Sequence, residues 1–300
     1  MKNCNFGQWP IWAFLWLAGL FVSCHMPADS DAKKRVLTVS IEPVRYLAEQ
    51  IGGDLFQVNC MVPQGSSPET YEPTPRQMLD VVGSEAYLRV GPIEFEQVWL
   101  PRLRENAPHM EVVDLSEGVE FIYTTHSHGN HRHEGVSDPH IWTSPANVRL
   151  MAHNLYRALC RLAPEDSAAI YRRWQRLDSV VVETDRHIRT MLSSPEASKI
   201  FMLYHPSLGY FARDYGLCSY CLEEDGKEPS PSRLKTITDE ALHHGIKVIF
   251  IQRGFDKRSA EAVAHAVGAR VVEIDPLGYD WPAVMIRIAE ALKVNDNNEE

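Results

Sequence analysis

The chain has 300 residues, of which 44% are hydrophobic and 23% are charged, and its formal net charge at pH 7 is −10. This length and this apolar content permit a large core, and we expect it to be divided between two lobes. An acidic chain is poorly suited to the phosphate backbone of nucleic acids, so we expect no nucleic-acid partner.

The N-terminus predicts export. Residues 11–22 form an unbroken run of apolar residues and glycine, which is typical of a signal peptide but shorter than the roughly 20 residues that span a bilayer. The run ends at a small residue followed by Cys24, as in a bacterial lipoprotein cleavage box, although Phe21 replaces the usual leucine. We therefore expect residues 1–23 to be removed, Cys24 to carry lipid, and residues 24–35 to form a tether. The alternative is an ordinary signal peptide, with Cys24 lost or free.

Strand and helix patterns alternate after the tether. Short β-rich runs predict strands, and apolar residues spaced three or four apart predict helices. We expect strands at 36–40, 58–62, 86–90 and 111–115, and helices at 43–51 and 74–82. This alternation favours a parallel sheet covered by helices, which we assign to an N-terminal lobe at residues 36–163.

The middle of the chain has a single long pattern. From Pro164 onward, apolar residues recur at three- and four-residue steps as far as Leu192. The pattern predicts one amphipathic helix over residues 164–193, roughly 40 Å long at 1.5 Å per residue. Because no partner pattern is found elsewhere, we expect this helix to pack along the body of the protein and not in a coiled coil.

A second alternation follows the long helix. We expect strands at 200–204, 248–251 and 271–274, and helices at 207–215, 230–242, 259–267 and 281–292. These elements form a C-terminal lobe at residues 194–294, and residues 295–300 form an acidic tail. The predicted fold class is α/β, with two lobes, each a small parallel sheet flanked by helices, joined by one long rigid helix.

Two cysteines of the second lobe lie close together. Cys218 and Cys221 form the motif Cys-Ser-Tyr-Cys. In an exported protein this spacing suits a disulfide or part of a metal site, but no second cysteine pair completes a zinc knuckle. A local disulfide and two free thiols both remain open.

Histidines are concentrated in one segment. Five of the 13 histidines lie between Thr125 and His140. Neutral imidazole is the commonest side-chain ligand for zinc, and the intervening glycine, serine and asparagine keep the backbone mobile. The run at residues 125–135 therefore indicates a metal-collecting loop that leads into an ordered segment, with a solvated polar loop as the alternative. The five histidines are His126, His128, His131, His133 and His140.

Four ligand-type side chains follow predicted strands. In open α/β sheets, ligands bind beyond the carboxyl ends of the strands. Glu69 lies in the loop after a first-lobe strand, His140 closes the histidine-rich loop, His205 follows the strand at 200–204, and Asp275 follows the strand at 271–274. Two imidazoles and two carboxylates would neutralise a divalent cation and suit Zn²⁺ or Mn²⁺. Three nearby residues, Glu42, Tyr71 and Glu72, are candidates for orienting these ligands or for ordinary loop contacts.

These motifs, in this order, resemble the zinc and manganese solute-binding lipoproteins of bacterial ABC importers, the zinc-uptake and Tro-type family. The matching segments are 43–54, 65–75, 138–142, 205–217, 228–232 and 271–278. The resemblance implies two α/β lobes joined by a rigid helix, with one metal ion between them. It also implies that His140, His205 and Asp275 are ligands. The first ligand of the family is usually a histidine, and Glu69 stands in its place.

Glu69 therefore has three interpretations. It ligates through its carboxylate, or it leaves a three-ligand site completed by water, or the site is weakened and Glu72 or a loop histidine replaces it. We favour the first. An oxygen donor relaxes the preference for zinc over manganese or iron, whereas the histidine-rich loop resembles that of zinc-type members. Zinc is therefore the expected ion, and manganese is the alternative.

The resemblance implies a function in transport. We expect an exported, monomeric solute-binding protein that captures Zn²⁺ or Mn²⁺ and delivers it to an ABC permease and its ATPase, touching the membrane only through its N-terminal lipid. The alternatives are a zinc-dependent hydrolase, a manganese- or iron-specific member, and an adhesin. A hydrolase would need an open coordination position and a general base, and the sequence has no His-Glu-x-x-His motif or nucleophile elbow.

Overall fold

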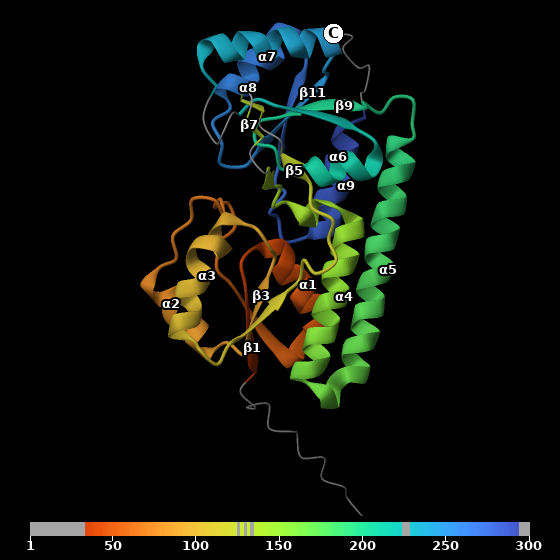
Figure 1. Ribbon diagram of the computed structural model, residues 1–300. Helices are drawn as coiled ribbons and strands as arrows, with labels where there is room; N and C mark the ends of the chain where they lie inside the picture. Colours follow the sequence, from red (N-terminus) through yellow and green to blue (C-terminus); the bar gives the residue numbers. More distant parts are fainter. Residues whose placement is uncertain (1–33, 125–126, 129–130, 133–134, 224–228, 294–300) are drawn as a thin grey trace, which may run out of the picture. The chain divides into compact units, whose positions relative to one another are not determined.

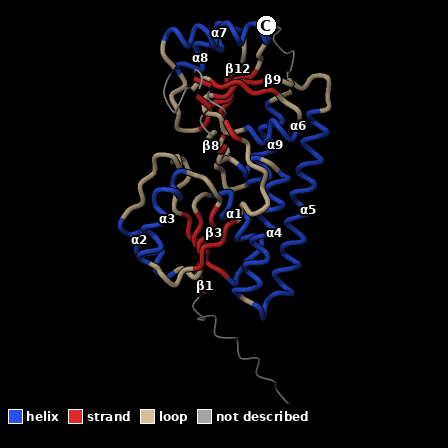
Figure 2. Tube along the Cα trace, in the orientation of Figure 1, coloured by secondary structure: helices blue, strands red, loops and turns tan. Residues whose placement is uncertain are grey.

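The computed structural model describes residues 34–124, 127–128, 131–132, 135–223 and 229–293. The described residues from 34 onward form one compact unit. Two parallel sheets, each with helices on both faces, lie within the described part of this unit (Figures 1 and 2). The predicted signal segment, Cys24 and the acidic tail at 295–300 fall outside the described residues.

The N-terminal sheet has four parallel strands in the order β2-β1-β3-β4. Figure 1 shows α2 and α3 on one side of this sheet and α1 and α4 on the other. The strands are β1 (Arg35–Val39), β2 (Phe56–Cys60), β3 (Ala86–Arg89) and β4 (Glu111–Asp114). The helices are α1 (Glu42–Gly52), α2 (Pro75–Asp80), α3 (Glu94–Asn106) and α4 (Pro145–Leu162).

The C-terminal sheet repeats this connectivity, with four parallel strands in the order β10-β9-β11-β12. In each sheet the first strand along the chain has neighbours on both sides, so the chain reverses direction across the sheet there. This is the point at which α/β sheets form ligand sites. The strands are β9 (Ile200–Leu203), β10 (Cys218–Cys221), β11 (Val248–Gln252) and β12 (Arg270–Ile274). The helices are α6 (Gly209–Tyr215), α7 (Pro231–His244), α8 (Arg258–Val267) and α9 (Trp281–Ala291).

The long helix is α5 (Ser167–Leu192), whose 26 residues extend about 39 Å at 1.5 Å per residue. A 3-10 turn, Pro164–Asp166, precedes it. The helix packs against α1 and α4 at one end and against α9 of the C-terminal lobe at the other. The helix packs along the body of the protein, as expected, but a partner pattern does exist, because α4 runs beside it and buries an apolar stripe that includes Val148, Met151 and Leu155.

One hydrophobic cluster runs through both lobes. It joins the core of the N-terminal sheet to α4, α5 and the face of the C-terminal sheet that α9 covers. A second cluster, which includes Met202, Ile249 and Val263, fills the opposite face of the C-terminal sheet beneath α7 and α8. A continuous core resists hinge motion, so the predicted rigid connection has a physical basis.

The histidine-rich segment contains short antiparallel pairs. β5 (Tyr123–Thr124) pairs with β8 (Val136–Ser137), and β6 (Ser127–His128) pairs with β7 (His131–Arg132). The four described cysteines are free, so the Cys218–Cys221 motif is a strand with two thiols and not a disulfide. Among the described helices, none has the length and apolarity needed to cross a membrane.

Candidate metal centre

Glu69 is held on a short turn after β2. The backbone amides of Thr70 and Tyr71 both donate to the carbonyl oxygen of Ser67, and the amide of Glu69 donates to the Ser67 hydroxyl at 3.2 Å. Thr74 closes the loop, because its side chain and that of Gln77 form a capping box at the start of α2. The Glu69 carboxylate is thus presented from a braced loop, with its side chain 34% exposed.

His140 is oriented by the carboxylate two residues before it. Asp138 Oδ1 accepts the backbone amide of His140 at 2.9 Å and lies 2.8 Å from ring atom Nδ1. Asp138 is itself buried, and its carbonyl oxygen accepts the hydroxyl of Tyr210 in the C-terminal lobe at 2.7 Å. A proton on Nδ1, shared with Asp138, leaves the Nε2 lone pair free to bind a metal ion.

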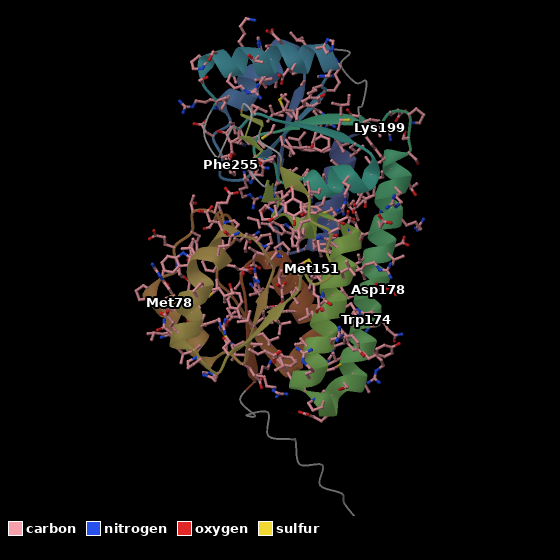
Figure 3. The ribbon with its side chains drawn as sticks, viewed as in Figure 1. Met78, Met151, Trp174, Asp178, Lys199 and Phe255 are labelled. Atoms are coloured by element: carbon pink, nitrogen blue, oxygen red, sulfur yellow. The ribbon has the colours of Figure 1, made fainter. Side chains whose placement is uncertain are left out.

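His205 has the same kind of support in the other lobe. It lies just beyond β9, and its Nδ1 is 3.1 Å from Oε2 of Glu223, which lies just beyond the neighbouring strand β10. The side-chain amide of Gln252 clamps the backbone, accepting from the amide of His205 at 3.2 Å and donating to its carbonyl oxygen at 2.6 Å. Phe255, labelled in Figure 3, stacks on the imidazole with ring centroids 5.7 Å apart.

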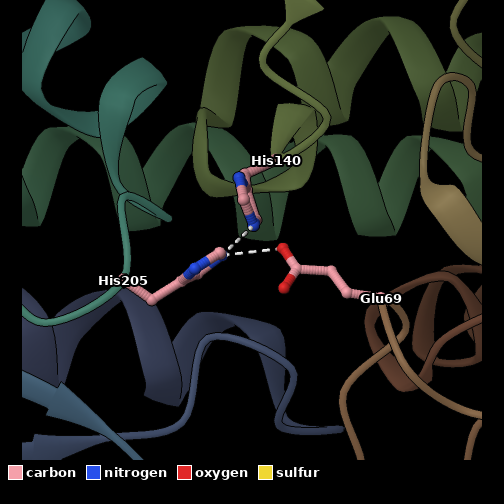
Figure 4. Close-up of side chains that lie close together, drawn as sticks. All are labelled: Glu69, His140 and His205. Atoms are coloured by element: carbon pink, nitrogen blue, oxygen red, sulfur yellow. Dashed lines mark hydrogen bonds and ion pairs between the residues drawn. The ribbon is translucent and has the colours of Figure 1, made fainter. Parts of the chain in front are cut away.

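The three side chains converge on one point (Figure 4). His205 Nε2 lies 3.3 Å from His140 Nε2 and 3.1 Å from Glu69 Oε1, and all three atoms are within 4.8 Å of one another. Two nitrogens that bind one tetrahedral zinc ion at about 2.0–2.1 Å are separated by about 3.3–3.4 Å. The donor set and its spacing therefore fit a divalent transition-metal ion.

The same contacts change the pKa values of His205 and Glu69. Burial alone would lower the pKa of His205, but the hydrogen bonds to Glu223 and Glu69 outweigh it and raise that pKa to about 9. The hydrogen bond from His205 in turn lowers the pKa of Glu69. At neutral pH a proton therefore occupies the place of a cation between the two side chains, and a metal ion must displace it.

Asp275 lies near the centre but does not join the three side chains. It follows β12 and lines the same cavity of about 60 Å³ as Glu69, His140 and His205. Its Oδ2 is 3.5 Å from Nη1 of Arg253, which also lines the cavity. Among the described residues, only the other three predicted ligands bring their donor atoms together.

The orienting carboxylates differ from the candidates chosen on sequence. Glu42 contacts Arg45 at 3.3 Å, Tyr71 donates to Gln77 at 2.8 Å, and Glu72 lines a second groove, which Glu69 also lines. Asp138 and Glu223 are the carboxylates that contact the histidines. Asp138 had a recognisable signal, since it belongs to the Asp-Pro-His motif, whereas the short strand before Glu223 has no strong strand pattern.

Among the described residues of the histidine-rich segment, His140 alone belongs to this cluster. His128 and His131 occupy directly opposed positions of the β6–β7 pair. His126 and His133 lie outside the described residues. The accessory role of these four histidines stays a prediction.

Comparison with known proteins identifies the family. A family model described as zinc-uptake complex component A, periplasmic, matches residues 37–294. The chain belongs to this family. The resemblance expected on sequence is therefore confirmed, and so is the two-lobed α/β fold.

Individual members of the family are similar over most of their length. A crystal structure of ZnuA superposes with a TM-score of 0.79 at 34% identity, covering 86% of this chain and 99% of that one. The high-affinity zinc uptake system protein ZnuA of Bacillus subtilis is 26% identical over 260 residues, which are 83% of this chain and 81% of that protein. The manganese ABC transporter substrate-binding lipoprotein ScaA of Streptococcus gordonii is 24% identical over 273 residues, 88% of this chain and 86% of that protein.

Proposed function

We propose that the protein is the extracytoplasmic solute-binding component of a metal-ion ABC importer and that it captures Zn²⁺ between its lobes. The observation that carries this proposal is the convergence of Glu69, His140 and His205 at distances suited to one ion. Each of these residues is held in place by hydrogen bonds of its own. Asp275 is the proposed fourth ligand, since it lines the same cavity. Membership of the zinc-uptake family supports the transport role.

Zinc is the proposed ion, and manganese is the alternative. Two imidazoles with one or two carboxylates form a mixed nitrogen–oxygen set, which zinc accepts in tetrahedral geometry. Manganese favours more oxygen ligands and a higher coordination number. The two imidazole donors favour zinc, whereas the carboxylate of Glu69 at the usual histidine position favours manganese.

We infer that the site binds and releases its ion without catalysing a reaction. A zinc hydrolase needs a carboxylate or imidazole free to act as a general base beside the ion. Asp138 and Glu223 are each held on a histidine Nδ1, and Asp275 is paired with Arg253. Each carboxylate contacting or lining the centre thus has a role in orientation or coordination.

We further propose how the protein is placed in the cell. Lipidation of Cys24 after removal of residues 1–23 would tether a monomer to the cell envelope, facing a permease that is driven by an ATPase. The lipoprotein name of the Streptococcus gordonii relative supports the tether. The lobe boundaries at 36–163 and 194–294, with a connecting helix at 164–193, stay predictions of the same kind.

Metal titration of purified protein tests the proposal. We expect one tightly bound Zn²⁺ per chain, measured by chelator competition and by metal analysis, and at least about 100-fold weaker binding in His140→Ala and His205→Ala, because each removes a donor atom. His265→Ala is the matched control, since His265 is exposed on α8 and does not line the cavity. A chain that binds no divalent ion at micromolar concentration would contradict the proposal, as would equal losses in His265→Ala.

A further inference from the structure

Asp275, one of the predicted ligands that line the cavity, forms an ion pair with an arginine side chain. Asp275 Oδ2 lies 3.5 Å from Nη1 of Arg253, and the side chain of Asp275 is only 20% exposed. This ion pair matters for a site that collects divalent cations, because the guanidinium occupies a carboxylate that could otherwise bind the ion.

The backbone around this pair leaves only side-chain rotation free. The amide of Arg253 donates to the carbonyl oxygen of Ile274 at 3.0 Å, which fixes the two residues on neighbouring strands. The amide of Gly278 donates to the carbonyl oxygen of Asp275 at 2.9 Å, and Trp142 Nε1 donates to that of Pro276 at 2.9 Å. The Asp275 carboxylate can therefore change partner by rotating its side chain, without a shift of the lobe.

The guanidinium has a second acceptor. Arg253 Nε lies 3.4 Å from Oε1 of Glu273, which also accepts from Lys257 Nζ at 2.7 Å. If Asp275 turns away, Arg253 keeps one carboxylate partner. The Arg253 side chain is 55% exposed, so its ion pairs are weak and screened by water, and exchange between partners costs little.

We propose that the ion pair with Arg253 keeps Asp275 from binding the incoming ion at first. The ion then binds Glu69, His140 and His205, and it must compete with the guanidinium for Asp275 as its fourth ligand. This inference rests on the proposed function and adds to it a residue that tunes affinity and release. Return of Asp275 to Arg253 would lower the coordination number of the ion by one and so favour its departure. The specificity of the site would then depend on how strongly each ion competes for this carboxylate.

Charge-matched variants test the inference. Arg253→Gln should tighten Zn²⁺ binding by about three- to fivefold, the scale of an exposed ion pair. Lys257→Gln is the control, because it removes the same charge from a side chain that is 50% exposed and pairs with Glu273, but Lys257 does not line the cavity. We expect Lys257→Gln to change the dissociation constant less than twofold.

A double-mutant cycle shows whether the effect passes through Asp275. In an Asp275→Asn background, Arg253→Gln should change affinity no more than Lys257→Gln does. The visible absorption of bound Co²⁺ gives an independent readout, since it depends on the ligand set: Asp275→Asn should alter the spectrum and Arg253→Gln should preserve it. Equal effects of the two charge-removing variants, persistence of the Arg253 effect without Asp275, or an unaltered spectrum in Asp275→Asn would each overturn the inference. A wild-type chain that binds no Zn²⁺ would instead overturn the proposed function, and this inference with it.

Discussion

At the scale of single residues, the centre depends on two histidines whose Nδ1 atoms each contact a carboxylate of another side chain. Asp138 lies 2.8 Å from His140 Nδ1 and Glu223 lies 3.1 Å from His205 Nδ1, and both carboxylates are buried. Such partners fix the tautomer and the ring orientation and make the free nitrogen a stronger donor. The two imidazoles are therefore arranged for coordination before an ion arrives.

Zinc binding should weaken as the pH falls. The pKa of His205 is raised to about 9, so at lower pH the metal-free protein carries a proton on this ring that the ion must displace. One displaced proton makes the apparent dissociation constant rise by about tenfold for each pH unit below 9 and level off above it. Calorimetry between pH 6 and pH 9, in buffers of different ionisation enthalpy, would measure both the constant and the released proton. A constant independent of pH over this range would contradict the assignment of His205.

Glu223→Gln should weaken zinc binding by about 10- to 100-fold while the fold is retained. The uncharged side-chain amide of the glutamine accepts a weaker hydrogen bond from Nδ1 of His205 than the carboxylate does. The imidazole therefore becomes less basic and its orientation is less well fixed. Glu261→Gln, at an exposed position of α8, is the control and should bind as the wild type does. Chelator competition measures the constants, and a Glu223→Gln variant with unchanged affinity would show that this carboxylate does not support the site.

The sequence could place Glu69, His140 and His205 together, because the loops that follow parallel strands meet at one edge of each sheet. The same argument applied to residues 218–221 would have found Glu223, but an edge strand of two cysteines, a serine and a tyrosine has no strong strand pattern. The partner of Asp275 could not be predicted. It depends on the guanidinium of Arg253, which lies just after the neighbouring strand β11 and is known only from the geometry.

At the scale of elements, a buried carboxyl group joins α3 to the sheet that carries the Glu69 loop. Glu96 is 2% exposed, and it accepts the amides of Val90 at 2.8 Å and Gly91 at 3.0 Å as well as the hydroxyl of Ser40. Burial raises the pKa of this carboxyl to about 7, although these hydrogen bonds oppose the shift. The neighbouring Phe95 contacts Tyr71 of the Glu69 loop, with ring centroids 6.2 Å apart.

Glu96→Ala should lower the free energy of unfolding by at least about 2 kcal/mol, because it leaves buried amides without an acceptor. Glu94→Ala, at an exposed position in the same turn of α3, is the control and should cost less than about 1 kcal/mol. Urea denaturation at neutral pH measures both values. Equal stability of the two variants would mean that the buried network does not brace the lobe.

Elements with strong apolar periodicity were predicted well, and weakly patterned ones were not. The run that became α5 was recognised because its buried side chains repeat at helical spacing over 26 residues. α3 was missed, since charged and polar residues interrupt its apolar positions and Pro101 lies inside it. α4 was not among the predicted helices, although its apolar residues have helical spacing, and its packing against α5 depends on tertiary structure.

At the scale of the whole molecule, both lobes share one core, and several hydrogen bonds cross between them. Trp281 Nε1 donates to the carbonyl oxygen of Trp142 at 2.7 Å, and Tyr279 donates to Glu49 at 2.5 Å. These contacts and the packing of α5 restrain the lobes on the side of the long helix. Capture and release are therefore expected to involve the ligand loops more than a hinge between lobes.

Deleting residues 126–133 should remove weak additional zinc and leave the tight site intact. The β5–β8 pair joins Tyr123 to Ser137 and Thr124 to Val136, so the deletion removes only the segment beyond this ladder and leaves His140 in place. Calorimetric titration should show the loss of low-affinity sites without a change in the tight constant. Loss of the tight site in the deletion variant would show that the ligands lie in the removed segment.

We propose that one ion is held between the lobes by Glu69, His140 and His205, and that it draws Asp275 away from Arg253. The most direct measurement is anomalous diffraction at the zinc edge from crystals of the zinc-loaded protein. We expect one dominant peak at about 2.0–2.2 Å from both Nε2 atoms and from a carboxylate oxygen of Glu69, with Asp275 turned toward the ion. A dominant peak in the histidine-rich segment, or none among these side chains, would contradict it.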